Sequence, residues 1–119
     1  MTWTPEIQIN IDCHDLDGMV AFYTAAFGYK PHGRAGEQYA SILPESGSGN
    51  KIVFQKVPES KAVKNRVHLD FIVGDANVES EAARCESLGA TRVERIEEHG
   101  GRWIVMLDPE GNEFCLCDC

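Results

Sequence analysis

The chain has 119 residues, of which 43% are hydrophobic and 25% are charged, and its formal net charge is −8. This length suits one domain with one core and is too short for two independent domains. The acidic balance argues against nucleic acid and anionic membranes as partners, because both require a cationic surface. No apolar run approaches the roughly 20 residues of a membrane-spanning helix, and the N-terminus lacks a signal-peptide pattern. We therefore expect a cytoplasmic protein.

The chain contains five cysteines, an odd number. No two of them have the Cys-x-x-Cys spacing of a zinc or redox motif. Without a secretion signal, we expect reduced thiols and no disulfide framework. The alternating pattern of Cys115, Cys117 and Cys119 suggests small apolar strand residues at a frayed end more than it suggests a metal cluster.

The first half of the chain predicts a strand, a helix and three further strands. Residues 6–13 alternate apolar and polar side chains, which is typical of a half-buried strand. Asp15 is a good N-cap for a following helix, and Gly28 is placed to end that helix in the left-handed conformation. Apolar residues between them recur on one helical face. The three strands that follow are predicted at residues 29–32, 38–43 and 51–57.

The same pattern restarts after a polar, basic segment at residues 58–66, which resembles a linker. Residues 67–73 alternate again, Asp75 is the second predicted N-cap, and Gly89 ends the second helix. Turn residues at 108–112 separate the last two strands. The three strands after the second helix are predicted at residues 91–96, 102–107 and 113–117.

The two halves also agree in spacing. Asp15 precedes Gln55 by 40 residues, and Asp75 precedes Cys115 by 40. Gln8 precedes Gln55 by 47 residues, and the same interval separates His68 from Cys115. These spacings predict an α+β fold made of tandem βαβββ modules. We expect a single domain over residues 1–119, with module one at 6–57, the linker at 58–66 and module two at 67–117.

Short segments spread over nearly the whole chain resemble the vicinal oxygen chelate superfamily, specifically its glyoxalase-like domain proteins. The resemblance implies a curled mixed sheet, an open barrel or cup, with helices outside and a ligand site inside. It also implies a homodimer. The segments that carry it are Asp15-Leu16, Ala21-Phe22-Tyr23, Phe27-Gly28, Val67-His68-Leu69-Asp70-Phe71, Leu88-Gly89-Ala90 and Asp108-Pro109-Glu110-Gly111-Asn112-Glu113-Phe114.

The face of the predicted sheet that points away from the helices is unusually polar. A buried polar group without a partner costs roughly 1–3 kcal/mol, so this face is expected to meet water, a ligand or a metal. We predict a small-molecule pocket there. The predicted ligand-binding residues are Gln8, Asn10, Gln55, His68, Asp70, Trp103 and Cys115.

The resemblance also points to four positions that ligate a divalent metal in metal-dependent members: Gln8, Gln55, His68 and Cys115. His68 and Gln8 match residues used in the family, whereas Gln55 and Cys115 replace expected glutamates. One imidazole, two neutral amides and one thiol form a weak site for a divalent ion. We therefore expect no cofactor, with a divalent metal as the alternative.

Two kinds of function follow. The first is a metal-independent binding protein that sequesters a cationic or aromatic small molecule, with Trp103 stacking on it, as the resemblance to bleomycin resistance proteins implies. The alternative is a lyase or isomerase, other than glyoxalase I, with His68 as catalytic acid and Glu113 or Asp70 as base, or with an atypical metal site. Within the enzyme alternative, Cys115 could act as a nucleophile. A third possibility is an interaction module with a vestigial pocket.

Overall fold

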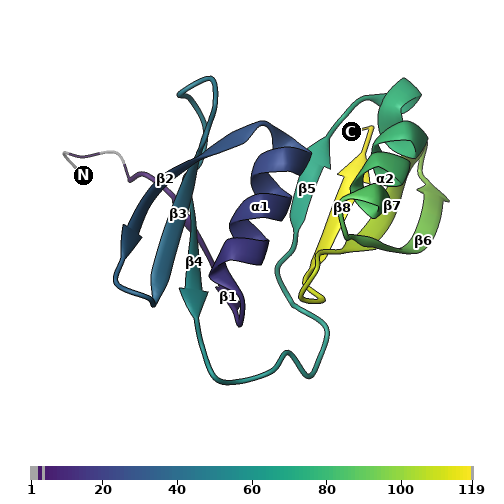
Figure 1. Ribbon diagram of the computed structural model, residues 1–119. Helices are drawn as coiled ribbons and strands as arrows, with labels where there is room; N and C mark the ends of the chain where they lie inside the picture. Colours follow the sequence, from purple (N-terminus) through teal and green to yellow (C-terminus); the bar gives the residue numbers. More distant parts are fainter. Residues whose placement is uncertain (1–2, 4, 119) are drawn as a thin grey trace. The chain divides into compact units, whose positions relative to one another are not determined.

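The computed structural model describes Trp3 and residues 5–118, and it divides into two compact units, Met1–Ser60 and Lys61–Cys119. Each unit contains one helix and one four-stranded sheet (Figure 1). The elements of the first unit are β1 (Ile9–Cys13), α1 (Leu16–Phe27), β2 (Tyr29–Ala35), β3 (Tyr39–Pro44) and β4 (Ile52–Lys56). The elements of the second unit are β5 (Leu69–Ile72), a short 3-10 helix η1 (Asp75–Asn77), α2 (Val78–Ser87), β6 (Thr91–Glu98), β7 (Gly101–Leu107) and β8 (Glu113–Cys117).

Both sheets have the same topology. The strand orders are β1-β4-β3-β2 and β5-β8-β7-β6, so the first and last strands of each module are neighbours. These neighbours pair in parallel, and the other pairs are antiparallel. Neither sheet closes into a barrel. The predicted α+β class and the tandem βαβββ order are therefore confirmed.

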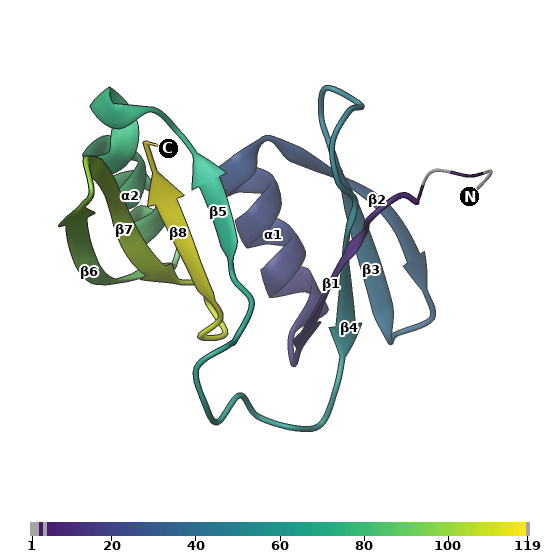
Figure 2. The same cartoon turned by 180° about the vertical axis from the view of Figure 1, so that it is seen from behind.

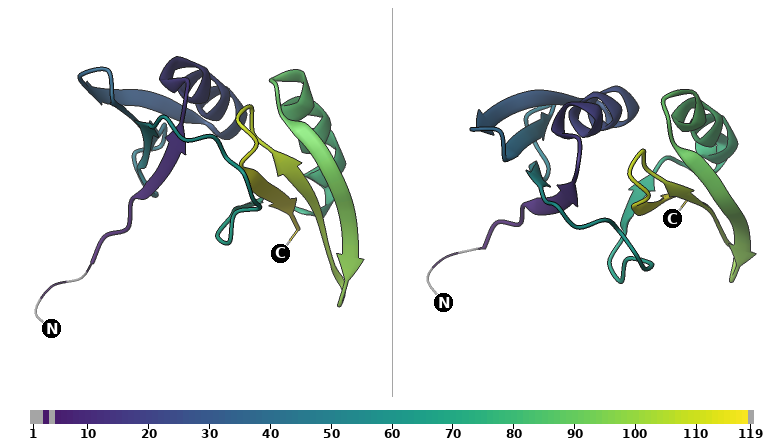
Figure 3. Two further views of the ribbon diagram at one scale, coloured as in Figure 1. Left: turned by 90° about the horizontal axis from the view of Figure 1, so that it is seen from below. Right: turned by 60° about the horizontal axis from the view of Figure 1, so that its bottom comes forward.

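Each helix covers one face of the sheet in its own unit, as the predicted alternation requires (Figure 2). Figure 3 shows the second sheet curling along β6 and β7, with α2 on one side and the segment before β5 on the other. The centres of the covered faces are apolar, and burying one such side chain contributes about 1.5–3 kcal/mol. Side chains at the centre of the first core are Met19, Tyr23, Ile42, Ile52 and Phe54, and those of the second are Cys85, Ile104, Met106, Phe114 and Leu116.

The two helices begin differently. The Asp15 carboxylate accepts a hydrogen bond of 3.0 Å from the Gly18 N–H, so this N-cap is confirmed. The prediction that Asp75 caps the second helix is wrong. Asp75 lies inside η1, and its carboxylate accepts a 3.0 Å bond from the Arg102 guanidinium. The chain enters α2 through this extra turn.

Several strand ends also differ from the predictions. The fifth strand is shorter than the predicted 67–73, and Val67 before it is 81% exposed. In contrast, β2 and β6 extend to Ala35 and Glu98, because each pairs along its length with the next strand of a hairpin. Hairpin partners extend a strand beyond the residues whose side chains are buried, so the apolar pattern underestimates its length.

The described cysteines differ in their state. Cys13, Cys85 and Cys115 are buried and are not part of a disulfide. Cys117 is disulfide-bonded, which corrects the expectation that every cysteine is reduced. Cys119, the end of the predicted alternating pattern, lies outside the described residues.

Within the described part of the chain, no helix has the length and apolarity needed to cross a bilayer.

Candidate functional site

A cavity of about 650 Å³ lies in the second unit and is built on the face of the sheet that α2 leaves uncovered. Five apolar side chains of β6 and β7 contribute to its lining, and an apolar lining suits the body of an organic ligand. Trp103, one of the predicted ligand-binding residues, is among them. The apolar lining residues are Ala62, Val63, Val93, Ile96, Trp103, Val105 and Leu107.

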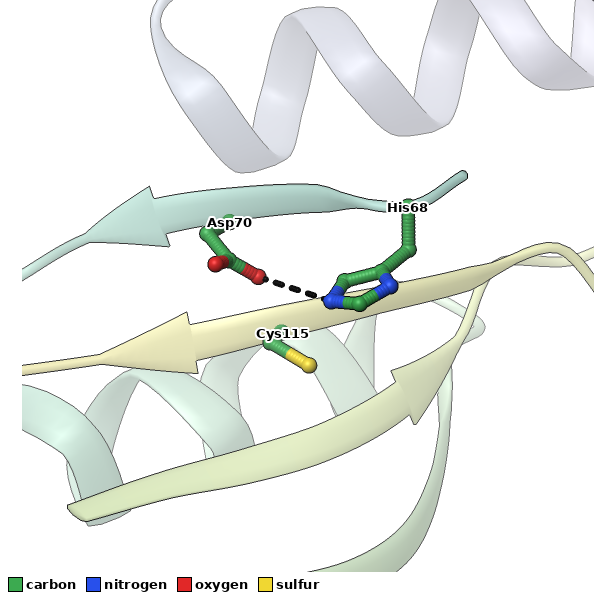
Figure 4. Close-up of side chains that lie close together, drawn as sticks. All are labelled: His68, Asp70 and Cys115. Carbon is green, nitrogen blue, oxygen red and sulfur yellow. Dashed lines mark ion pairs between the residues drawn. The ribbon is translucent and has the colours of Figure 1, made fainter. Parts of the chain in front are cut away.

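Polar side chains of β8 and of the chain just before β5 complete the lining. His68, Glu113 and Cys115 all border the cavity. In the parallel pairing of β5 with β8, Asp70 lies opposite Cys115. Figure 4 shows His68 and Asp70 pointing toward each other beside the Cys115 thiol, with 3.2 Å between His68 Nε2 and Asp70 Oδ1. Side-chain donors of all three residues lie within 4.8 Å of one another.

Cys115 is only 5% exposed. Burial, followed by the negative charge of Asp70 and a hydrogen bond to it, raises the pKa of Cys115 to about 11. The thiol is therefore protonated at neutral pH, and only the thiolate is a good nucleophile. This environment argues against Cys115 as an activated nucleophile and favours a thiol that donates to the Asp70 carboxylate.

Glu113 has both carboxylate oxygens occupied. Oε1 lies 2.9 Å from Lys61 Nζ, and Oε2 accepts a 3.0 Å bond from the Asn65 N–H. Burial raises the pKa of Glu113, but the hydrogen bonds from Lys61 and Asn65 outweigh this effect and lower it overall. The side chain is 10% exposed. Glu113 therefore holds the segment before β5 in place, and a role as catalytic base would require these bonds to break.

Lys61 and Asn65 belong to the segment that we expected to be a plain linker. Lys61 Nζ also donates to the Val63 carbonyl at 2.8 Å, and the Asn65 side chain donates to Asn112 Oδ1 at 3.1 Å. We call residues 61–65 the strap. Lys61, Ala62, Val63 and Lys64 form one wall of the cavity. Composition gives no signal for this role beyond the basic character of the segment.

The remaining predicted site residues lie in the first unit. Gln8 is exposed just before β1 and borders another cavity, of about 870 Å³, with His32 and Lys51. Asn10 is exposed and pairs with Val53. Gln55 is half-buried, with Asp12 as its partner on β1 and Tyr39 on β3.

Strand register separates Gln8 from Gln55. Ile9 pairs with Ile52, so Gln8 stands level with Lys51, four residues before Gln55. Four residues of strand span roughly 13 Å. In the second unit, Asp70 pairs with Cys115, so His68 stands only two residues short of Cys115. The equal 47-residue spacings therefore do not produce equal sites.

A repeated sequence motif supports this register. Gly49-Asn50-Lys51 precedes β4, and Gly111-Asn112-Glu113 leads into β8. Aligning the two motifs matches Val53, and not Gln55, with Cys115. The register pairs Val53 with Asn10 in the same way as it pairs Cys115 with Asp70. The repeat could have revealed this register from the sequence. Counting from Asp15 and Asp75 instead matched Gln55 with Cys115.

The described residues do not fit a hard divalent cation such as Mn²⁺ or Mg²⁺. Such ions prefer several oxygen donors, most of them carboxylates. The second unit offers one imidazole, one carboxylate and one thiol in the cluster, and the first unit offers an apolar Val53 at the matching strand position. We derive no reaction step through such an ion.

Comparisons with known proteins agree with the fold. A family model described as a glyoxalase-like domain matches residues 8–117. A glyoxalase/bleomycin resistance protein/dioxygenase family enzyme from Burkholderia phytofirmans PsJN is 23% identical, with a TM-score of 0.78 and coverage of 92% of this chain and 94% of that chain. A mutant of the fosfomycin resistance protein FosX from Listeria monocytogenes, complexed with Mn(II) and 1S,2S-dihydroxypropylphosphonic acid, is 19% identical. Its TM-score is 0.82, with coverage of 98% of this chain and 91% of that chain.

A hypothetical protein, SA1046, from S. aureus has a TM-score of 0.74 at 18% identity and covers 97% of each chain. No curated protein matches the sequence. At these identities the solved structures establish the fold alone, whereas the family model spans nearly the whole chain. The chain therefore belongs to the glyoxalase-like domain family, within the vicinal oxygen chelate superfamily.

Proposed function

We propose that this protein binds a small aromatic or cationic molecule without a metal, using the cavity of the second unit. The observation that carries the proposal is the combination of Trp103 and other apolar lining residues with His68 and Cys115 on the border and Asp70 beside these two. Apolar walls with a few placed polar groups are the usual composition of a small-molecule site. This function requires no chemistry from the buried Cys115 thiol or from the engaged Glu113 carboxylate.

The charge around the cavity supports a cationic ligand. Glu94 and Glu110 border it, and the chain carries a net charge of −8. Lys61 is already paired with Glu113, so the remaining lysine of the lining is Lys64, and two carboxylates oppose it. A cation over the indole ring of Trp103 gains about 0.5–2 kcal/mol, depending on how far it is desolvated.

Calorimetric titration with benzyltrimethylammonium, an aromatic cation, tests this proposal. We expect saturable binding that weakens at least tenfold in Trp103→Ala. The matched control is Trp3→Ala, which removes a tryptophan that is 64% exposed and outside the cavity lining. Benzyl alcohol carries the same ring without the charge and should bind more weakly. Equal loss in both tryptophan variants, or no binding of any probe, would contradict the proposal.

A second candidate is a lyase or isomerase, and the 3.2 Å contact between His68 and Asp70 favours it. A carboxylate beside an imidazole orients the ring and stabilises its protonated form, as acid–base catalysis requires. The test is hydrogen–deuterium exchange at carbon in dihydroxyacetone, followed by NMR in heavy water. Faster exchange that disappears in His68→Gln supports catalysis, whereas the background rate in both proteins supports the binding protein.

We also propose a cytoplasmic homodimer with a small molecule as its partner, and without nucleic acid or membrane partners. The acidic charge supports the exclusion of polyanionic partners. Light scattering coupled to size-exclusion chromatography tests the dimer. A mass near 13.2 kDa over the working concentration range would contradict it.

A further inference from the structure

We propose that the strap, residues 61–65, is a movable lid on the cavity of the second unit, and that Glu113 is the latch that keeps it closed. The strap swings away to admit a ligand, and a bound ligand holds it in place. This inference rests on the proposed function, because it concerns the same cavity, and it adds a conformational step to binding there.

One carboxylate holds both ends of the strap. Glu113 Oε1 lies 2.9 Å from Lys61 Nζ, and Glu113 Oε2 accepts a 3.0 Å bond from the Asn65 N–H. The Asn65 side chain adds a 3.1 Å bond to Oδ1 of Asn112, the residue before Glu113. Lys61 and Asn65 are the first and last residues of the strap, so the loop between them is closed by the start of β8.

The strap has the features of a segment that opens locally. It contains no helix or strand (Figure 2), and among the described residues no backbone-to-backbone hydrogen bond reaches it. Its first four residues are exposed. Segments with few buried contacts and exposed hydrogen bonds open at a free-energy cost below that of global unfolding. The strap can therefore open while the core of the second unit stays folded.

The middle of the strap carries the side chain that responds to a ligand. Val63 is 77% exposed, and it lines the cavity together with Ala62 and Lys64. An exposed apolar side chain gains free energy when the apolar body of a ligand covers it. A ligand that contacts this wall binds the closed strap better than the open one, and it therefore shifts the population toward the closed state.

Limited digestion with trypsin, without any ligand, tests the latch. Cleavage after Lys64 is the reporter, since Lys61 is itself bonded to Glu113. When opening is fast, the cleavage rate follows the population of the open form. In Glu113→Gln we expect this cleavage to accelerate about fivefold to thirtyfold, because losing the bonds to a charged group shifts an equilibrium by about that factor.

Two controls separate opening of the strap from unfolding of the unit. Glu81→Gln is the matched variant, because Glu81 accepts a 2.7 Å bond from Arg84 on α2 and does not line the cavity. Cleavage after Arg92, which lies within β6, requires the sheet to unfold. We expect its rate to rise less in Glu113→Gln than the rate after Lys64.

A second arm adds benzyltrimethylammonium at saturating concentration. We expect hydrogen exchange of the Asn65 amide, which donates to Glu113, to slow at least fivefold when followed by NMR. Val63→Thr keeps the shape of the side chain and adds a hydroxyl, so it should weaken binding at least threefold. Val67→Thr is the matched control, because Val67 is 81% exposed and does not line the cavity.

The outcomes distinguish this inference from the proposed function. Equal cleavage after Lys64 in Glu113→Gln and Glu81→Gln would overturn the inference. Binding of the probe without slower exchange at Asn65 would also overturn it and leave the binding function standing. Failure of the probe to bind would overturn the proposed function alone, since the digestion without ligand still decides whether Glu113 latches the strap.

Discussion

At the scale of single residues, two features suppress ionisation of the Cys115 thiol: its burial and the Asp70 carboxylate beside it. A thiol with a pKa of about 11 has only about 0.1% thiolate at pH 8, compared with about a quarter for an ordinary cysteine with a pKa of 8.5. We expect iodoacetamide to alkylate Cys115 at least 100-fold more slowly than it alkylates glutathione. Mass-spectrometric mapping of the adducts over time measures this rate.

The same experiment separates the two causes of the raised pKa. In Asp70→Asn, the negative charge beside the sulfur disappears while burial remains, so the pKa of Cys115 falls part of the way toward its ordinary value. Alkylation should then accelerate, and Cys85, whose pKa is raised chiefly by burial, should keep its slow rate. An unchanged rate at Cys115 would show that access to the sulfur, and not its ionisation, limits the reaction.

At the scale of elements, the strap depends on one carboxylate of β8. Because the pKa of Glu113 in the folded state lies below its ordinary value of 4.5, ionised Glu113 contributes stability that is fully present above the unfolded-state pKa. That contribution is lost as the pH falls through the folded-state pKa. We expect Glu113→Gln to lower the free energy of unfolding by about 1–2 kcal/mol at neutral pH and by less in acid.

Urea unfolding at neutral and acidic pH measures this difference. Glu94→Gln is the control, since Glu94 borders the same cavity and is exposed. A surface change of this kind usually alters stability by about 0.5 kcal/mol or less. If Glu113→Gln and Glu94→Gln behave alike at every pH, the strap does not depend on the bonds to Lys61 and Asn65.

Element identity could be predicted from the sequence because local chemistry determines it. The alternation in residues 6–13, the Asp15 cap and the left-handed Gly28, with φ of 67°, all act within a few residues. Strand register could not be predicted in the same way. A slip of two residues leaves every side chain on the same face of the sheet, so the apolar pattern of β4 is unchanged by it.

The site was partly predictable because side chains alternate between the two faces of a strand. This alternation placed His68, Asp70 and Cys115 on one face, and the structure brings them together. The strap was missed because its contacts to Glu113 span about fifty residues and leave no periodic signal. Asp75 failed as a cap because a distant arginine, Arg102, binds its carboxylate.

At the scale of the whole molecule, the two units raise the question of cooperativity. Each comprises about 60 residues, a size at which only about 60% of the unfolded surface is buried and stability is marginal. We therefore propose that the chain unfolds as a single domain. Ile52→Val and Ile104→Val each remove one methylene from a fully buried side chain and should each cost about 0.5–1.5 kcal/mol.

Differential scanning calorimetry of the two variants shows whether the units unfold together. In a single cooperative transition, both substitutions lower the same melting temperature, and the calorimetric and van't Hoff enthalpies agree. Two resolved transitions, each sensitive to only one substitution, would show that the units unfold separately. The expected behaviour would place the second unit's cavity on a scaffold to which both cores contribute stability.

Partner residues are 43 positions apart in β1 and β4 and 45 positions apart in β5 and β8. The parallel strand pairs of the two halves therefore differ in register by two residues. This difference limits where a metal ligand can be engineered into the first unit. Restoring an acidic ligand by Gln55→Glu would place the carboxylate one pleat repeat too far along the strand. The residue to redesign is Val53, which shares its strand position with Cys115 and carries no donor atom.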